Sequence, residues 1–248
     1  FVFPLLGFAG MSVLAEYALL NFFGAAAGTD VAREDLVVLS VAQWPAWAQI
    51  IVLFVARDFV QWCVHRLLHR VPWLWEFHKV HHSVEQMGFA AHLRYHWMEN
   101  IVYRTLEYLP LALLGFGPVN FFIVYLISLV IGHWNHSNIR LPLGPLKYIL
   151  NNPQMHIWHH AHDLPAGHRY GVNYGRSLSV WDYLFGTAAI PSDGRDIRLG
   201  FPGVDDGFPK TLGAQLVHPF YSFSDGVSGR SGTPASAKTR SSSRASAP

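Results

Sequence analysis

The chain has 248 residues, of which 51% are hydrophobic and only 14% are charged, and its formal net charge is +2. Soluble domains carry roughly 25% charged residues, so this deficit points to lipid as the main solvent, and the small net charge gives no case for nucleic-acid binding. The single cysteine, Cys63, excludes an internal disulfide and a thiolate metal site.

Two apolar segments open the chain. Residues 1–28 carry no charge except Glu16 and are long enough to cross a bilayer. They lack the basic start of a signal peptide, so we do not interpret them as one. A polar break at 29–35 separates them from residues 36–56, which carry no charge. We predict that residues 1–56 form the N-terminal transmembrane helices.

A second apolar region, 101–139, follows a polar block rich in histidine at 57–99. The residues Gly115-Phe116-Gly117-Pro118 interrupt this region, and glycine together with proline predicts a turn. We therefore expect two transmembrane helices joined as a hairpin. The predicted fold is all-α: an integral-membrane helical bundle of about four transmembrane helices, with a cap that carries the histidines.

The domain boundaries follow from these changes in composition. A catalytic domain is predicted at 57–190 and includes the hairpin. A C-terminal extension is predicted at 191–221. Residues 222–248 are mostly Ser, Gly, Ala, Arg and Pro, which leave little to bury, so we expect a disordered tail.

Charge asymmetry predicts the orientation in the membrane. The loop at 29–35 contains Arg33 against Asp30, Glu34 and Asp35. If all histidine blocks share one face, that face carries Arg66, Arg70, Lys79, Arg94, Arg104, Arg140 and Lys147. The positive-inside rule then predicts a multi-pass protein with its active site on the cytoplasmic face.

The 15 histidines are not scattered along the chain. Three clusters are HRLLH (His65, His69), HKVHH (His78, His81, His82) and HIWHH (His156, His159, His160). Positions i, i+3 and i+4 share one face of a helix, so each cluster can present its imidazoles to one point. One HxxHH can occur by chance, but three clusters beside predicted spans favour metal binding. Eight ligands are too many for one ion, so we expect two.

Further residues are candidates on weaker grounds. We predict His136 and His96 as additional ligands. Ligating imidazoles usually donate their other N–H to a carboxylate or carbonyl. Asp58, Glu99 and Asp163 are candidates for that supporting role, although each can instead be a solvated charge or a helix cap. His133 is a further supporting candidate, whereas we expect loop or surface positions for His162, His168 and His218.

The ligand types limit the chemistry. The clusters lack carboxylates, which argues against a Glu/His di-iron bundle, and the HExxH pattern of a zinc hydrolase is absent from the sequence. Neutral nitrogen ligands in a lipid-facing protein suit two iron ions that activate O₂ against a C–H bond. With no GxGxxG pattern, we predict no tightly bound organic cofactor and an external electron donor. A membrane zinc-dependent lipid hydrolase and a metal transporter remain as alternatives.

The motifs resemble those of the fatty acid hydroxylase/sterol desaturase superfamily. The similarity runs from Asp58 to Thr187, about half of the chain. It is carried by DFVQWCVHRLLH, HKVHHS, LRYHWME, HWNHSN, NPQMHIWHHAHD and NYGRSLSVWDYLFGT. The segment GPLKYILNNPQMHIWHH is also similar to the branch that contains alkylglycerol monooxygenase.

The resemblance implies four transmembrane helices, a cytosolic cap with two irons, and hydroxylation or desaturation of an acyl chain, sterol or ether lipid with O₂. Cytochrome b5, ferredoxin or a reduced pterin would supply electrons. The ligand positions carry over onto the three clusters and His136, and His96 matches only one branch. Asn173, Gly175, Trp181 and Asp182 match a trailing signature that closes the cap. His92 departs from the pattern, which commonly has a small residue there.

Overall fold

A computed structural model describes residues 2–32, 35, 37, 41–139 and 141–225 of the chain. The predicted tail beyond Asp225, together with Arg33, Glu34 and Arg140, lies outside these residues. The helices are α1 (Val2–Ala27), α2 (Ala46–Arg70), α3 (Pro72–His82), η2 (Phe89–Leu93), α4 (Trp97–Ala112), α5 (Pro118–Asn135), η3 (Gly144–Tyr148), α6 (Pro153–His159), α7 (Val180–Leu184) and α8 (Leu212–Asp225). The described residues contain no β-strand, only two isolated bridges, so the predicted all-helical class is confirmed for them.

Two helices of the described part, α2 and α5, are long and apolar enough to cross a membrane. With 25 residues, α2 is about 37 Å long, which exceeds the hydrocarbon core of a bilayer. The predicted hairpin is present as α4 and α5, and Gly115 has the positive φ of 84° that the turn needs. Pro118 begins α5, where its missing N–H costs nothing.

The long helices pack around an apolar core. Leu53 of α2, Tyr108 of α4 and Phe121 of α5 are among its buried members. A buried ion pair also joins the same helices, because Arg57 donates to Glu107 at 2.5 Å and to Ser128 at 2.9 Å. These buried polar contacts fix how the three helices pack together.

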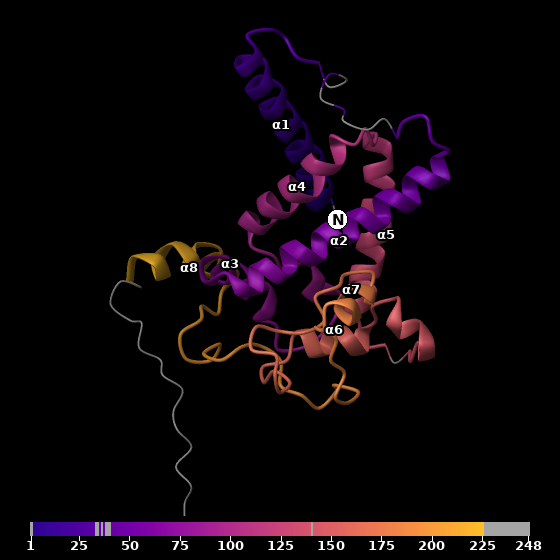
Figure 1. The fold of residues 1–248 in the computed structure, drawn as a ribbon. Coiled ribbons are helices and arrows are strands. Elements are labelled where there is room, and N and C mark those ends of the chain that lie inside the picture. The colour runs from indigo at the N-terminus through magenta and orange to yellow at the C-terminus, as the bar shows by residue number, and fades with distance from the viewer. Residues whose placement is uncertain (1, 33–34, 36, 38–40, 140, 226–248) are drawn as a thin grey trace, which may run out of the picture.

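Helices α6 and α7, with the loops around them, form the cap at one end of this bundle. In Figure 1, α6 and α7 lie at the opposite end of the molecule from the loop that follows α1. Asp58 of α2 accepts hydrogen bonds from the backbone N–H groups of Ser177 and Leu178 and from the Trp181 indole. A carboxylate near the middle of α2 therefore ties the loop before α7 to the bundle.

The trailing signature is held by a second carboxylate. Asp182 accepts hydrogen bonds from the backbone of Tyr174 and Gly175 and from the side chains of Trp62 and Thr187. A Cβ on Gly175 would lie 2.3 Å from the Leu178 carbonyl oxygen, so only glycine allows this approach. The loop from Asn173 to Thr187 is thereby fixed against α2, close to the first histidine cluster.

Candidate metal centre

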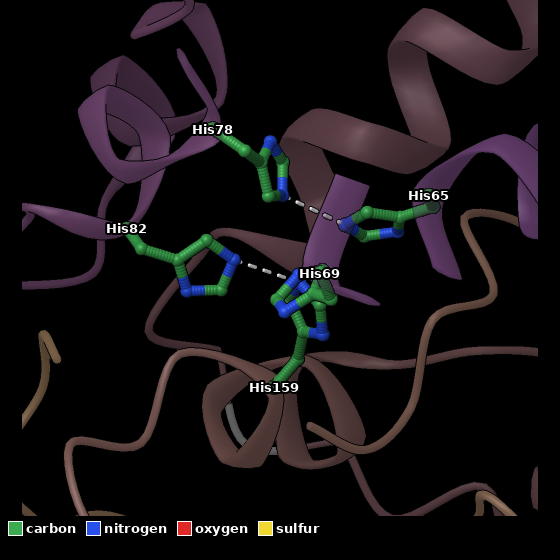
Figure 2. A group of neighbouring side chains, drawn as sticks. All are labelled: His65, His69, His78, His82 and His159. Atoms are coloured by element: carbon green, nitrogen blue, oxygen red, sulfur yellow. Dashed lines mark hydrogen bonds between the residues drawn. The ribbon is translucent and has the colours of Figure 1, made fainter. Parts of the chain in front are cut away.

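Nine histidines converge in the cap as two groups. The first group is His65, His69, His78, His82 and His159, and the second is His81, His136, His156 and His160. Within each group, one potential ligand atom from every residue lies within 4.8 Å of all the others. Figure 2 shows the first group, with rings from three separate segments pointing toward one another. Two neighbouring groups of this kind can hold two metal ions.

Helical spacing distributes the clusters between the groups. In HKVHH, His78 and His82 are four residues apart and belong to the first group, whereas His81 belongs to the second. In HIWHH the pattern is reversed: His156 and His160 belong to the second group and His159 to the first. Each HxxHH motif therefore contributes to both groups, which holds the two sites side by side.

Most of these rings are oriented through their Nδ1 atoms. Five backbone carbonyls and one carboxylate accept from Nδ1: Tyr174 from His65 at 2.7 Å, Tyr170 from His69 at 3.1 Å, Arg94 from His81 at 3.1 Å, Gly132 from His136 at 2.7 Å, Val172 from His159 at 2.8 Å and Glu99 from His78 at 2.6 Å. A neutral imidazole that donates from Nδ1 carries a lone pair on Nε2. Nε2 is then the atom that can bind a metal ion.

Lone pairs consequently face each other inside the groups. The Nε2 atoms of His65 and His78 lie 3.1 Å apart, and those of His81 and His136 lie 3.3 Å apart. With Nδ1 protonated in all four rings, neither pair has a hydrogen to share between its Nε2 atoms. Two nitrogens bound to one ion at about 2.1 Å and at right angles lie about 3.0 Å apart. The donor set therefore fits metal ions.

Burial keeps these imidazoles neutral. It lowers the pKa of His78, His81, His82, His156 and His160 well below the usual value, and that of His159 to about 4. Neighbouring imidazoles lower most of these values further. Since a ligating imidazole must be deprotonated, the site is ready to bind metal at neutral pH.

The structure does not bring His96 into either group. His96 is the N-cap of α4, where its Nδ1 accepts from the Met98 N–H at 3.1 Å and its Nε2 donates to the Leu216 carbonyl at 2.7 Å. Both ring nitrogens are thus engaged, and we leave His96 out of the proposed ligand set. Glu99 completes the capping box and also accepts from His78, so it lies beside a histidine of the first group.

The other predicted supporting residues lie in different places. Asp58 binds the loop before α7, as described above, rather than a histidine ring. Asp163 is exposed and accepts from the neighbouring His162. His133 donates to the Phe89 carbonyl at 3.1 Å, and its ring centroid lies 4.6 Å from that of His92.

Two residues outside the two groups touch them directly. Tyr95 stacks on His81 with ring centroids 4.7 Å apart and planes at 9°. The ring of His92 stacks on His136 at 4.9 Å. The departure of His92 from the family pattern was the available signal for one of them. The carbonyls that accept from Nδ1 carry no signal in the sequence, because any residue supplies a carbonyl.

Comparison with known proteins agrees with this site. Residues 50–187 match the family described as fatty acid hydroxylase. The chain is 35% identical to ornithine lipid hydroxylase OlsE of Rhizobium tropici over 179 residues. This aligned region covers 72% of this chain and 52% of the relative. It is 36% identical over 137 residues to alkylglycerol monooxygenase of Homo sapiens, covering 54% and 29%.

A third relative, fatty acid hydroxylase vlmA of Lecanicillium sp, is 28% identical over 174 residues, which cover 64% of this chain and 47% of the relative. The chain thus spans about half or less of the length of these relatives. No solved structure matches. The match over residues 50–187 contains all nine clustered histidines and confirms the resemblance drawn from the motifs. The chain belongs to the fatty acid hydroxylase family.

Proposed function

We propose that this chain is a membrane-bound non-haem di-iron oxygenase that hydroxylates or desaturates a lipid with O₂ and external electrons. The observation that carries the proposal is the pair of histidine groups whose ring nitrogens converge without protons to share. Hydroxylation would convert one C–H bond to C–OH, with the second oxygen atom leaving as water after uptake of two electrons and two protons. Desaturation would break two C–H bonds and, with two further electrons from the external donor and two protons, release both oxygen atoms as water.

The donor atoms favour iron over the alternatives. Within the described part of the chain, both groups consist of histidine only. Five and four imidazoles exceed the three protein ligands of a catalytic zinc, which leaves the zinc hydrolase less favoured. Imidazole suits iron, and two bound irons would supply O₂ activation. A transporter would need ligands spread along its spans, whereas these are gathered in the cap.

The chain's own residues prepare the site. Six rings are held by Nδ1 contacts, so the ligands need little rearrangement on binding metal. His160 and His159 are almost fully buried. Because α2 carries its histidines in its last turns, the metal groups lie at the end of an apolar bundle, within reach of a lipid in the bilayer.

The membrane arrangement is also part of the proposal. We propose four spans, formed by α1, α2, α4 and α5, with the cap in the cytoplasm. Among the residues that support this side, Arg66, Arg70, Lys79, Arg94 and Lys147 belong to the described part. The substrate would be a lipid, as the names of the relatives indicate for those proteins. The electron donor would be cytochrome b5, ferredoxin or a reduced pterin.

The test measures metal, oxygen and product together. The purified protein should contain two irons and consume O₂ only when both a reductant and membrane lipid are present. Lipids from cells with and without the gene should differ by one added oxygen atom or by two lost hydrogen atoms. A product that forms equally well without O₂ would refute the oxygenase function and favour the zinc hydrolase. Metal movement across vesicles, without any lipid product, would favour the transporter.

A further inference from the structure

Helix α8 turns its polar side toward the protein. Gln215 is buried, its Oε1 accepts from the Arg94 guanidinium at 2.9 Å, and its Nε2 donates to the Pro209 carbonyl at 2.7 Å. His218 also faces inward, with Nε2 3.9 Å from a carboxylate oxygen of Glu76 on α3. A surface helix of a soluble protein has the reverse arrangement, with its polar residues in water.

The outward side of α8 is apolar. Leu212, Val217 and Phe220 are 59%, 45% and 47% exposed. At 3.6 residues per turn, these three side chains fall within one half of the helix circumference. Residues 211–224 contain no Asp, Glu, Lys or Arg. An apolar surface of this kind marks contact with lipid or with another protein.

The outward side of α8 continues into the segments where two proposed spans end. The ring centroid of Phe220 lies 5.7 Å from that of Phe77 on α3 and 6.0 Å from that of Trp97, the first residue of α4. Trp73, at the start of α3 and just beyond the end of α2, lies 6.3 Å from Phe77. Trp73 and Trp97 are about half exposed. Exposed tryptophans beside the ends of spans are typical of the interface between lipid and water.

The length of α2 agrees with this depth. A helix of about 37 Å that begins at one boundary of a hydrocarbon core about 30 Å thick extends about 7 Å into the opposite head-group layer. Helix α3 begins there, and α8 lies beside α3 (Figure 1). A hydrogen bond of 2.7 Å from Nε2 of His96 to the Leu216 carbonyl also joins α8 to the start of α4. Lipid head groups are therefore the surroundings nearest to the outward side of α8.

We propose that α8 lies in the head-group layer of the bilayer, on the side where the histidine groups lie, with Leu212, Val217 and Phe220 inserted toward the acyl chains. Such a helix binds the membrane through the apolar area that it buries. This inference rests on the membrane arrangement proposed above and not on the reaction. Because α8 follows the region matched to the family, which ends at Thr187, family membership does not supply it.

The test places one fluorescent label on the outward side of α8. Cys63→Ser removes the single native cysteine, and Gly213→Cys then provides one site where a Cβ would meet open space. The full chain carries a nitrobenzoxadiazole label in nanodiscs of phosphatidylcholine and phosphatidylglycerol. Quenching by doxyl-labelled lipid and by aqueous iodide is measured. Val217→Cys is a second outward position, which keeps the test valid if Gly213→Cys does not fold.

Gly207→Cys is the matched control. Gly207 is exposed, a Cβ there would also meet open space, and Asp205 and Asp206 precede it directly. Two adjacent carboxylates keep that loop in water. An interfacial helix buries its apolar face about 5–10 Å into the boundary between head groups and acyl chains, so we expect lipid to quench the α8 label at least about two-fold more strongly than the control label. Iodide should show the reverse order.

Two results would overturn the proposal. Equal iodide quenching at the α8 position and at the control position would mean that the outward side of α8 lies in water. Protection of the α8 label from both quenchers would mean that protein covers it, and a disulfide between two unlabelled Gly213→Cys chains would identify that protein as a second copy. The measurement needs neither iron nor O₂. A lipid-quenched label in a protein that consumes no O₂ would therefore refute the oxygenase and leave the interfacial helix standing.

Discussion

The Oε2 atom of Glu99 lies 2.6 Å from Nδ1 of His78, with both side chains almost fully buried. The same carboxylate accepts from the backbone N–H of His96 at 3.2 Å and so closes the start of α4. One carboxylate thus orients a histidine ring of the first group on α3 and caps the helix that leads into the hairpin. The first histidine group and the α4–α5 hairpin are coupled through it.

Replacing this carboxylate should weaken metal binding. Glu99→Gln keeps the size of the side chain but replaces the carboxyl group that holds Nδ1 of His78 with an amide. Loss of a residue that hydrogen-bonds to a metal-binding histidine typically lowers the metal affinity by about 10–100-fold. Iron retained during dialysis against a graded chelator series measures the effect. Glu76→Gln is the control, because Glu76 pairs with Lys79 outside the two groups. Equal iron retention in the two variants would contradict the prediction.

The two groups should respond differently to loss of one ligand. His81→Ala leaves three histidines in the second group, whereas His159→Ala leaves four in the first. We expect both variants to lose activity and His81→Ala to lose more iron, falling to roughly one ion per chain, since three ligands hold an ion less firmly. Elemental analysis of protein purified from membranes gives the ratio. His218→Ala should keep both ions, because His218 lies near Glu76 and not in either group.

His96 should affect stability rather than metal content. His96→Asn keeps an acceptor for the Met98 N–H, whereas His96→Ala removes it, which typically costs about 1 kcal/mol at a helix N-cap. Thermal unfolding in detergent should therefore rank the native protein and His96→Asn above His96→Ala. All three should hold the same amount of iron. A loss of iron in both variants would contradict this prediction and indicate that His96 is a metal ligand.

Acid should destabilise the metal-free protein. Burial lowers the pKa of His159 to about 4, below the value near 6.5 that it has when unfolded. Between about pH 6.5 and about pH 4, His159 is therefore protonated in the unfolded chain but neutral in the folded protein. The free energy of unfolding falls as the pH drops through this range, and below about pH 4 His159 causes no further change. Across this pH range, the titration of His159 lowers the free energy of unfolding by roughly 3 kcal/mol.

Urea unfolding of chelator-treated protein between pH 7.5 and pH 4.5 follows this loss. His159→Asn should give a shallower decline, because it removes one of the groups that resist protonation. The same decline in both proteins would show that His159 is not held neutral in the folded state.

The sequence predicted which histidines gather together better than it predicted how they divide between the two groups. Helical spacing was enough to bring His78, His81 and His82 to one face, but the allocation of adjacent residues to separate groups depends on how α3 and α6 pack. His96 follows the same i+4 spacing from His92, yet a helix begins directly after it, and a cap uses the same ring nitrogens as a metal. Four spans were expected, and the described residues contain two helices that meet the criteria of length and composition.

Gly132 and His92 should prove to be coupled. A Cβ on Gly132 would lie 2.3 Å from Cε1 and 2.4 Å from Nε2 of the His92 ring, closer than any real contact. Gly132→Ala must therefore displace the ring that stacks on His136, and overpacking of this kind costs roughly 1–3 kcal/mol. His92→Ala makes room for the added methyl group, so the double variant should be more stable than Gly132→Ala alone. Unfolding of the four proteins in a double-mutant cycle measures this coupling. Additive effects would mean that the His92 ring moves aside at no cost, and that its place against His136 is not required.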